Sequence, residues 1–308
     1  MSPIILSRMR PVHRAVLRGG HVISPQAFMI ANRQNSTNTK LTQKSSWTHP
    51  IYTREEILAV RTAHHKANTW QDKVALGSVR FLRWGMDLVT GYKSQSSMDT
   101  GAKGYAMSED KWITRFIFLE SVAGVPGMAA GMLRHLKSLR QMKRDHGWIE
   151  TLLEEAYNER MHLLTFLKLA EPGPLMRLMV LGAQFIFFTG FSLAYMISPQ
   201  ICHRFVGYLE EEAVITYSKA ITDLDNGHLP QWEKLQAPQM AIKYWQMPEG
   251  QRCIRSLLLY VRADEAKHRE VNHTLGNLNQ TDPNPFSAKF KVQGALSQLE
   301  VDGSKKQI

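Results

Sequence analysis

The sequence predicts an all-α protein, and three features of its 308 residues carry this prediction. Apolar residues recur with helical spacing in long segments from Asp110 onward. Glycine and proline separate these segments, as they commonly do at helix ends. No clear runs with the alternating pattern of a half-buried strand lie between the turn signals. Together these features favour a bundle of helices over a sheet.

The pattern predicts six helices and three parts of the chain. We expect helices at about residues 70–92, 110–140, 147–170, 174–197, 199–226 and 250–277. Gly227, Pro230 and Pro238 separate the last two, and Pro283 and Pro285 predict a loose C-terminal tail. The expected organisation is a leader and flexible N-terminal arm at 1–50, a helical bundle domain at 51–280 and a flexible tail at 281–308.

The net charge of +11 is concentrated at the N-terminus. Residues 1–54 contain no Asp or Glu and eight basic residues, which account for most of that charge. This composition is typical of a mitochondrial transit peptide, with a basic disordered tail as the alternative. Because the rest of the chain is close to neutral, we expect no nucleic-acid partner.

Two segments are more apolar than a soluble bundle requires. One spans about residues 112–133 and is interrupted by Arg115 and Glu120. The other, 178–197, contains no charged residue, and at 1.5 Å per residue its length of about 30 Å could cross a bilayer core. Glycine and polar residues dilute it, and basic residues flank it on both sides. A helix lying in the membrane interface is therefore the competing interpretation.

Two Glu-x-x-His motifs, Glu159–His162 and Glu265–His268, indicate a metal site. Residues three apart on a helix share one face, so each motif can hold one metal ion. A single motif of this kind is weak evidence, because a solvated face or a hydrogen-bonded core histidine more often explains it.

Glutamates in apolar surroundings strengthen the prediction of a metal site. Glu120 lies in an apolar run, and the triplet Glu210–Glu212 lies between Leu209 and Ala213. Such carboxylates cost several kcal/mol to bury unless they are paired or bind a metal. Di-iron bundles take one Glu-x-x-His pair from each of two helices and one Glu from each of two others. The sequence therefore predicts a ferritin-like four-helix bundle that holds two iron ions.

The residue types of this cluster restrict the metal. Carboxylates and imidazoles suit iron or manganese. The two cysteines, Cys202 and Cys253, have neither the spacing of a thiolate site nor that of a disulfide framework. Only one member of the glutamate triplet can face the metals, because successive helical residues point about 100° apart.

Four longer strings resemble the signatures of the alternative oxidase family. They are LESVAGVPGM at 119–128, NERMH at 158–162, LEEEAVITY at 209–217 and RADEAKH at 262–268, and the resemblance covers about residues 70–277. It implies iron ligation by Glu120, Glu159, His162, Glu210, Glu265 and His268. The implied reaction is cyanide-resistant oxidation of ubiquinol by O₂, with formation of water and without proton pumping.

The resemblance also implies roles for residues around the iron ligands. Tyr217 would be a redox-active tyrosine, although its spacing alone is equally that of an ordinary core tyrosine. The implied quinol pocket consists of Arg115, Leu119, Glu212, Ala213 and Thr216. Residues that would support the site by hydrogen bonding or packing are Asn158, Asp264, Trp245, Tyr244, His203 and Arg83. A homodimer is implied as well, with His135 and Arg140 at its interface.

The predicted ligands restrict how the chain can meet a membrane. A single crossing by 178–197 would place His162 and Glu210 on opposite sides, which the shared site excludes. The other apolar segment carries Glu120 and so belongs to the bundle. We therefore expect a monotopic protein that lies on one leaflet through the apolar faces of about 76–92 and 178–197. The resemblance implies the matrix side of the inner mitochondrial membrane.

Three other functions stay open at this point. An iron-storage bundle could use the same six ligands, but it would not require an apolar membrane face. A plastid plastoquinol oxidase is the nearer alternative, because the transit peptides of both organelles share their composition. A structural protein of the membrane surface would leave the buried glutamates without a role.

Overall fold

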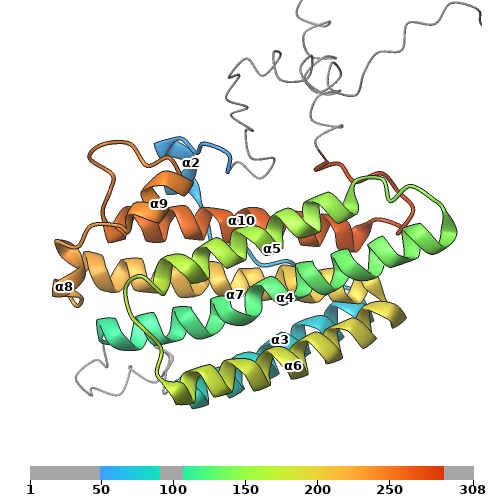
Figure 1. The fold of residues 1–308 in the computed structure, drawn as a ribbon, viewed down its shortest axis with the longest axis horizontal. Helices are drawn as coiled ribbons and strands as arrows, with labels where there is room; N and C mark the ends of the chain where they lie inside the picture. The colour runs from blue at the N-terminus through green and yellow to red at the C-terminus, as the bar shows by residue number, and fades with distance from the viewer. Residues whose placement is uncertain (1–48, 91–106, 288–308) are drawn as a thin grey trace, which may run out of the picture. The chain divides into compact units, whose positions relative to one another are not determined.

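The computed structural model describes residues 49–90 and 107–287, and this part of the chain is helical (Figure 1). Its helices are α2 (Arg54–Ala59), α3 (Trp70–Thr90), α4 (Glu109–Gln141), α5 (Trp148–Phe166), α6 (Pro174–Ile197), α7 (Pro199–Asp225), α8 (Pro230–Glu233), α9 (Gln239–Tyr244) and α10 (Ile254–Asn277). The β contact within these residues is an isolated bridge between Gln236 and Cys253. The all-α prediction is confirmed.

The six long helices lie close to their expected positions, and the differences have local causes. α5 ends at Phe166 rather than near 170, because a turn over residues 167–169 leads into the proline-containing segment before α6. α10 begins at Ile254 rather than 250, directly after the bridge residue Cys253. The helices α2, α8 and α9 were not predicted, since four to six residues show too little periodicity.

Four of the long helices form the bundle that holds the predicted metal ligands. α7 packs along α10, and α4 packs along α5. α3 packs against α7, and α6 packs against α4 and α7, so both lie on one outer side of the bundle (Figure 1). The predicted architecture of a ligand-bearing bundle with two additional apolar helices is confirmed.

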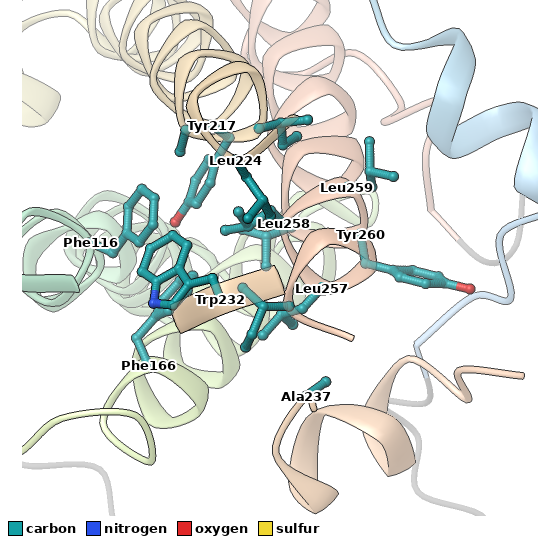
Figure 2. Close-up of a cluster of buried hydrophobic side chains, with 14 of the residues drawn as sticks. Phe116, Phe166, Tyr217, Leu224, Trp232, Ala237, Leu257, Leu258, Leu259 and Tyr260 are labelled. Atoms are coloured by element: carbon teal, nitrogen blue, oxygen red, sulfur yellow. The ribbon is translucent and has the colours of Figure 1, made fainter. Parts of the chain in front are cut away.

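An aromatic cluster from several helices fills one end of the bundle. The ring centroid of Phe116 lies 4.8 Å from that of Tyr217 and 4.9 Å from that of Phe166. Figure 2 shows these rings gathered with Trp232, beside Leu257 and Leu258 of α10. Burying large aromatic side chains is among the strongest contributions to a core. The cluster therefore fixes α4, α5 and α7 around the ring of Tyr217.

Helices α4 and α6 share a long apolar stretch but differ in how much of it is buried. Both α4 and α6 are long and apolar enough to cross a membrane by length and composition alone. More than half of the apolar window in α4 is buried, against 11% of that in α6. α4 is thus a core helix, as its Glu120 required. The polar Gln184 of α6 faces the bundle, where its side-chain nitrogen donates to the carbonyl oxygen of Ser121 at 2.6 Å.

Large apolar side chains cover the outward faces of α3 and α6. On α3 the exposed ones are Trp70, Val74, Phe81, Leu82, Trp84 and Leu88. On α6 they are Leu175, Leu178, Leu181, Phe185, Ile186, Phe188, Leu193, Met196 and Ile197. An apolar surface of this kind marks a membrane or protein contact rather than a water-exposed face.

Two segments assigned on sequence to the flexible ends contact the bundle. His49, at the end of the predicted arm, is buried. In the predicted tail, the Asn284 side chain is fully buried and donates to the carbonyl oxygen of Gly147 at 2.9 Å and to the Thr151 hydroxyl at 2.7 Å. The rest of the predicted leader, arm and tail, at 1–48 and 288–308, lies outside the described residues.

The close approach of α4 to α5 can be tested at Gly127. A Cβ atom there would lie 2.5 Å from the carbonyl oxygen of Leu152 and 3.1 Å from Ala156 Cβ. We expect Gly127→Ala to lower the free energy of unfolding by about 1–3 kcal/mol, because the helices must separate. Chemical denaturation of the solubilised protein, followed by circular dichroism, measures this.

Gly77 in α3 provides the matched control. No described atom would lie within 4 Å of a Cβ at this position. Gly77→Ala should therefore stabilise the helix by up to about 1 kcal/mol. Equal effects of the two substitutions would contradict the close packing of α4 on α5.

Candidate metal centre and adjoining cavity

Two groups of side chains meet inside the bundle, and they share two members. One group consists of Glu120, Glu159, His162 and Glu265, whose ligand atoms all lie within 4.8 Å of one another. The second consists of Glu159, Glu210, Glu265 and His268, within the same limit. All six residues are buried. This arrangement fits a site for two metal ions, which Glu159 and Glu265 would share.

The structure thus brings together all six predicted ligands, with one difference in how they are shared. The sequence suggested that each Glu-x-x-His motif holds its own ion. Instead, the glutamates of both motifs belong to both groups, His162 is grouped with Glu120, and His268 with Glu210. The i, i+3 spacing brings both members of each motif to the cluster, and the packing of the neighbouring helices decides which group each member joins.

The glutamate triplet of α7 points in three directions, as helical geometry requires. Glu210 faces the metal centre. Glu211 accepts from His273 Nε2 at 2.8 Å and from the backbone nitrogen of His65 at 2.8 Å. Glu212 pairs with the guanidinium group of Arg83. One turn of α7 therefore meets three separate environments.

The cluster contains four carboxyl groups and only two imidazoles, and this excess of acidic groups shifts the pKa values of its members. Burial, and then repulsion from Glu265, raises the pKa of Glu120 and of Glu210 well above the usual range. Burial also acts to raise the pKa of Glu159, but His162 and His268 outweigh it and lower that pKa. Both histidines have raised pKa values despite their burial, because carboxylates surround them.

The polar atoms at the centre of the cluster fit a metal. Among the described residues, Glu120 Oε2, both side-chain oxygens of Glu159, Glu265 Oε2, His162 Nδ1 and His268 Nδ1 are buried without a hydrogen bond of normal geometry. Buried polar groups are nearly always satisfied, so these converging atoms need other partners. Two divalent cations would satisfy them and offset the charge, and four carboxylates with two imidazoles suit iron or manganese.

Asp264 links one histidine of the cluster to its surroundings. Its oxygen Oδ2 lies 3.1 Å from His162 Nε2 and accepts hydrogen bonds from Asn158 at 3.1 Å and Trp245 at 2.8 Å. Tyr244 joins through Asn158, which donates to its hydroxyl oxygen at 3.0 Å. Four of the predicted supporting residues therefore form one hydrogen-bonded group behind His162.

Tyr217 lies directly beside the cluster. Its ring is fully buried in the aromatic cluster, and its hydroxyl donates to Glu120 Oε1. Burial, with the nearby Glu120, raises the pKa of Tyr217 well above the usual range, so the hydroxyl keeps its proton. A protonated phenol in contact with a ligand carboxylate can pass a proton and an electron to the centre together.

A cavity of about 760 Å³ adjoins the metal centre. Helices α3, α4, α6 and α7 form its largely apolar wall, and Glu120, Glu210 and Glu265 line its inner end. The five residues predicted to bind quinol all line it: Arg115, Leu119, Glu212, Ala213 and Thr216. The apolar faces of α3 and α6 therefore flank a space that reaches the ligands.

Alternating charges cross the wall of this cavity. Arg115 is 1% exposed and donates to Asp87 at 2.8 Å. Arg83 donates to Asp87 at 3.1 Å and also pairs with Glu212. Arg115 is thus a buried, paired residue. Arg83 lies at the cavity wall in this charge network, and Asp87 joins the two arginines.

The remaining predicted residues lie outside the two groups of candidate ligands. His203 is buried between Tyr195, whose hydroxyl oxygen lies 3.1 Å from His203 Nε2, and Asn272, whose Oδ1 lies 3.1 Å from His203 Nδ1. Asn272 in turn donates to the carbonyl oxygen of His268 at 3.0 Å. His135 and Arg140 are exposed on α4.

Comparison with known proteins agrees with this geometry. The family model described as "Alternative oxidase" matches residues 52–277. The chain belongs to the alternative oxidase family. Proteins named "Alternative oxidase, mitochondrial" from Aspergillus niger and Emericella nidulans are each 69% identical over 249 residues, covering 80% of this chain and 71% and 70% of theirs. A protein of the same name from Ajellomyces capsulatus is 63% identical over 250 residues.

Membership of the alternative oxidase family makes the chain an oxidase with a helical core suited to metal binding.

Several residues around the site of this oxidase were not predicted from the sequence. Asp87 gave one usable signal, since an acid four residues after Arg83 on a helix favours an ion pair. His49 and Tyr52 gave none, because their partner Asp264 is more than 200 residues away.

The shared glutamates lead to a prediction about metal content in this oxidase. Glu159 belongs to both ligand groups, whereas Glu210 belongs to one. We expect Glu159→Ala to reduce bound metal from about two ions per chain to below one, and Glu210→Ala to leave about one, because each ion needs several ligands. Elemental analysis after removal of loose metal measures this.

Glu150→Ala is the control, because Glu150 is an exposed acid on the same helix as Glu159. It should retain the wild-type metal content. Equal losses in the Glu159 and Glu210 variants would show that Glu159 does not bridge two ions.

Proposed function

We propose that the protein oxidises ubiquinol and reduces O₂ to water at two iron ions, in a cyanide-resistant reaction that pumps no protons. The observation that carries this proposal is the apolar cavity between α3 and α6, whose inner end is lined by three carboxylates of the metal centre. A lipid-soluble reductant can enter such a cavity and approach the centre without crossing water. Iron is proposed because the donors that converge there in the described part of the chain are carboxylates and imidazoles, and because the alternative oxidase family is a di-iron family.

The chain's own residues would bind and orient the quinol. Arg115, which pairs with Asp87, and Glu212, which pairs with Arg83, are polar groups in an otherwise apolar wall. They are therefore suited to hold the quinol head group. Leu119, Ala213 and Thr216 would shape the space around it. Bound iron would supply the electron transfer to O₂. Tyr217 would hold a proton at Glu120 and supply an electron from its ring.

We also propose that the protein lies on one leaflet of the inner mitochondrial membrane, on its matrix side. The exposed apolar faces of α3 and α6 support the contact with a leaflet, and the mitochondrial names of the relatives support the organelle. Trp70 and Trp84 on the exposed side of α3 suit the interface between lipid and water. Quinol oxidation and O₂ reduction would then release and consume protons on the same side. No net charge would cross the membrane, which is why the reaction would not pump protons.

Oxygen uptake tests the proposed reaction. Purified full-length protein, supplied with a ubiquinol analogue and cyanide, should consume O₂ and contain about two iron ions. Ala213→Trp should keep its iron but lose at least about tenfold in turnover, because the added ring fills the quinol cavity.

Ile51→Trp is a matched control, since Ile51 is 69% exposed. It should turn over like the wild type. Iron binding without quinol turnover in the wild type would favour an iron-storage protein, and a clear preference for plastoquinol would favour the plastid-type enzyme.

We also propose that the protein forms a homodimer through α4. Met128, Met132, Leu136 and Leu139 are exposed large apolar residues at helical spacing on this helix, beside His135 and Arg140. Leu136→Asp should shift the protein toward the monomer in sedimentation experiments, because a charge opposes burial of this face. Leu235→Asp, at an exposed apolar residue outside α4, should not; a dimer that persists in Leu136→Asp would contradict this interface.

A further inference from the structure

The segment before α2 reaches the surroundings of the metal centre. His49 Nε2 lies 2.7 Å from Asp264 Oδ1, and the Tyr52 hydroxyl donates to the same oxygen at 2.7 Å. The side chains of His49 and Asp264 are 4% and 2% exposed. The contact between His49 and Asp264 is therefore buried and shielded from solvent, unlike an ion pair on the surface.

Asp264 connects His49 to a predicted metal ligand through its other oxygen. His162 Nδ1 lies 3.3–3.4 Å from carboxylate oxygens of Glu120, Glu159 and Glu265, and so faces the centre. For Nδ1 to bind a metal, the hydrogen of the ring must be on Nε2, which lies 3.1 Å from Asp264 Oδ2. Metal-binding histidines commonly donate their second N–H to a carboxylate in this way.

The orientation of His49 makes it a donor to Asp264. Among the described residues, His49 Nδ1 has no hydrogen-bond partner, so the ring hydrogen belongs on Nε2, facing the carboxylate. Three aromatic rings pack around the His49 imidazole. The distance from its ring centroid is 5.1 Å to that of Tyr52, 5.0 Å to that of Tyr244 and 6.0 Å to that of Trp245. Pro50 also restricts the backbone of His49 to extended conformations.

We propose that His49 is a positioning residue of the metal centre, which acts through Asp264 to set how electron-rich the ligand His162 is. A carboxylate with fewer donors is a stronger acceptor for those that remain. Without His49, Asp264 would draw more strongly on the His162 N–H, and the imidazole would stabilise ferric over ferrous iron. The inference rests on the proposed function, because it requires iron at His162.

The midpoint potential of the iron centre tests this role. In the iron-loaded full chain, His49→Phe keeps a ring but removes the donor, and the potential should fall. A tenfold change in the ratio of ferric to ferrous affinity would lower the potential by about 59 mV for a one-electron step. Tyr52→Phe removes one hydroxyl from the same oxygen and should shift the potential in the same direction, even if His49→Phe loses its iron.

Two further variants separate the hydrogen bond from general loosening of the segment. His49→Gln restores an N–H donor and should recover part of the wild-type potential. Thr53→Ala removes the side-chain cap of α2, where Thr53 accepts from the Glu56 backbone, without touching Asp264. It should leave the potential unchanged.

The outcomes distinguish this inference from the proposed function. Wild-type potentials in iron-containing His49→Phe and Tyr52→Phe would overturn the inference and leave the quinol oxidase intact. An equal shift in Thr53→Ala would overturn it too, because loosening the segment would then be the cause. A wild-type protein that binds no iron would contradict the proposed function itself.

Discussion

The burial of four carboxylates at one point of the bundle is the constraint on which the rest of the structure depends. Each would cost several kcal/mol to remove from water without compensation, and they also repel one another. Two histidines offset part of that charge, and cations at the shared oxygens would offset the rest. Because the ligands come from α4, α5, α7 and α10, the site sets the register of all four helices at once.

That constraint also decides which helices carry the exposed apolar faces. α4 is as apolar as a crossing helix, but Glu120 ties it to the centre and most of its apolar window is buried. α3 and α6 carry none of the predicted metal ligands, so their outer faces are free to be apolar and exposed. The cavity follows from the same division, since α3 and α6 contribute apolar residues to its wall while α4, α7 and α10 contribute the three carboxylates at its inner end.

The sequence predicted what depends on local spacing, and it missed what depends on distant partners. Helical periodicity, two i, i+3 motifs and glutamates in apolar surroundings predicted the bundle and a metal site within it, whereas the choice of Glu210 from its triplet came from the resemblance to the alternative oxidase family. The sharing of Glu159 and Glu265 between two groups was not predicted, because it depends on how α5 and α10 face each other across the core. His49 was likewise missed, since its acid-free surroundings resemble a leader and Asp264 is 215 positions away.

The triplet on α7 shows how closely the separate parts of the site are coupled. Within one turn, Glu210 faces the metal centre, Glu211 anchors the segment before α3 through His65, and Glu212 pairs with Arg83 at the cavity. A rotation of α7 by one residue, about 100°, would move all three carboxylates out of their environments together. The metal centre, the cavity wall and the docking of the N-terminal segment are therefore fixed by one helical register. A substitution that rotates α7 would therefore displace Glu210, Glu211 and Glu212 together, and with them all three parts of the structure.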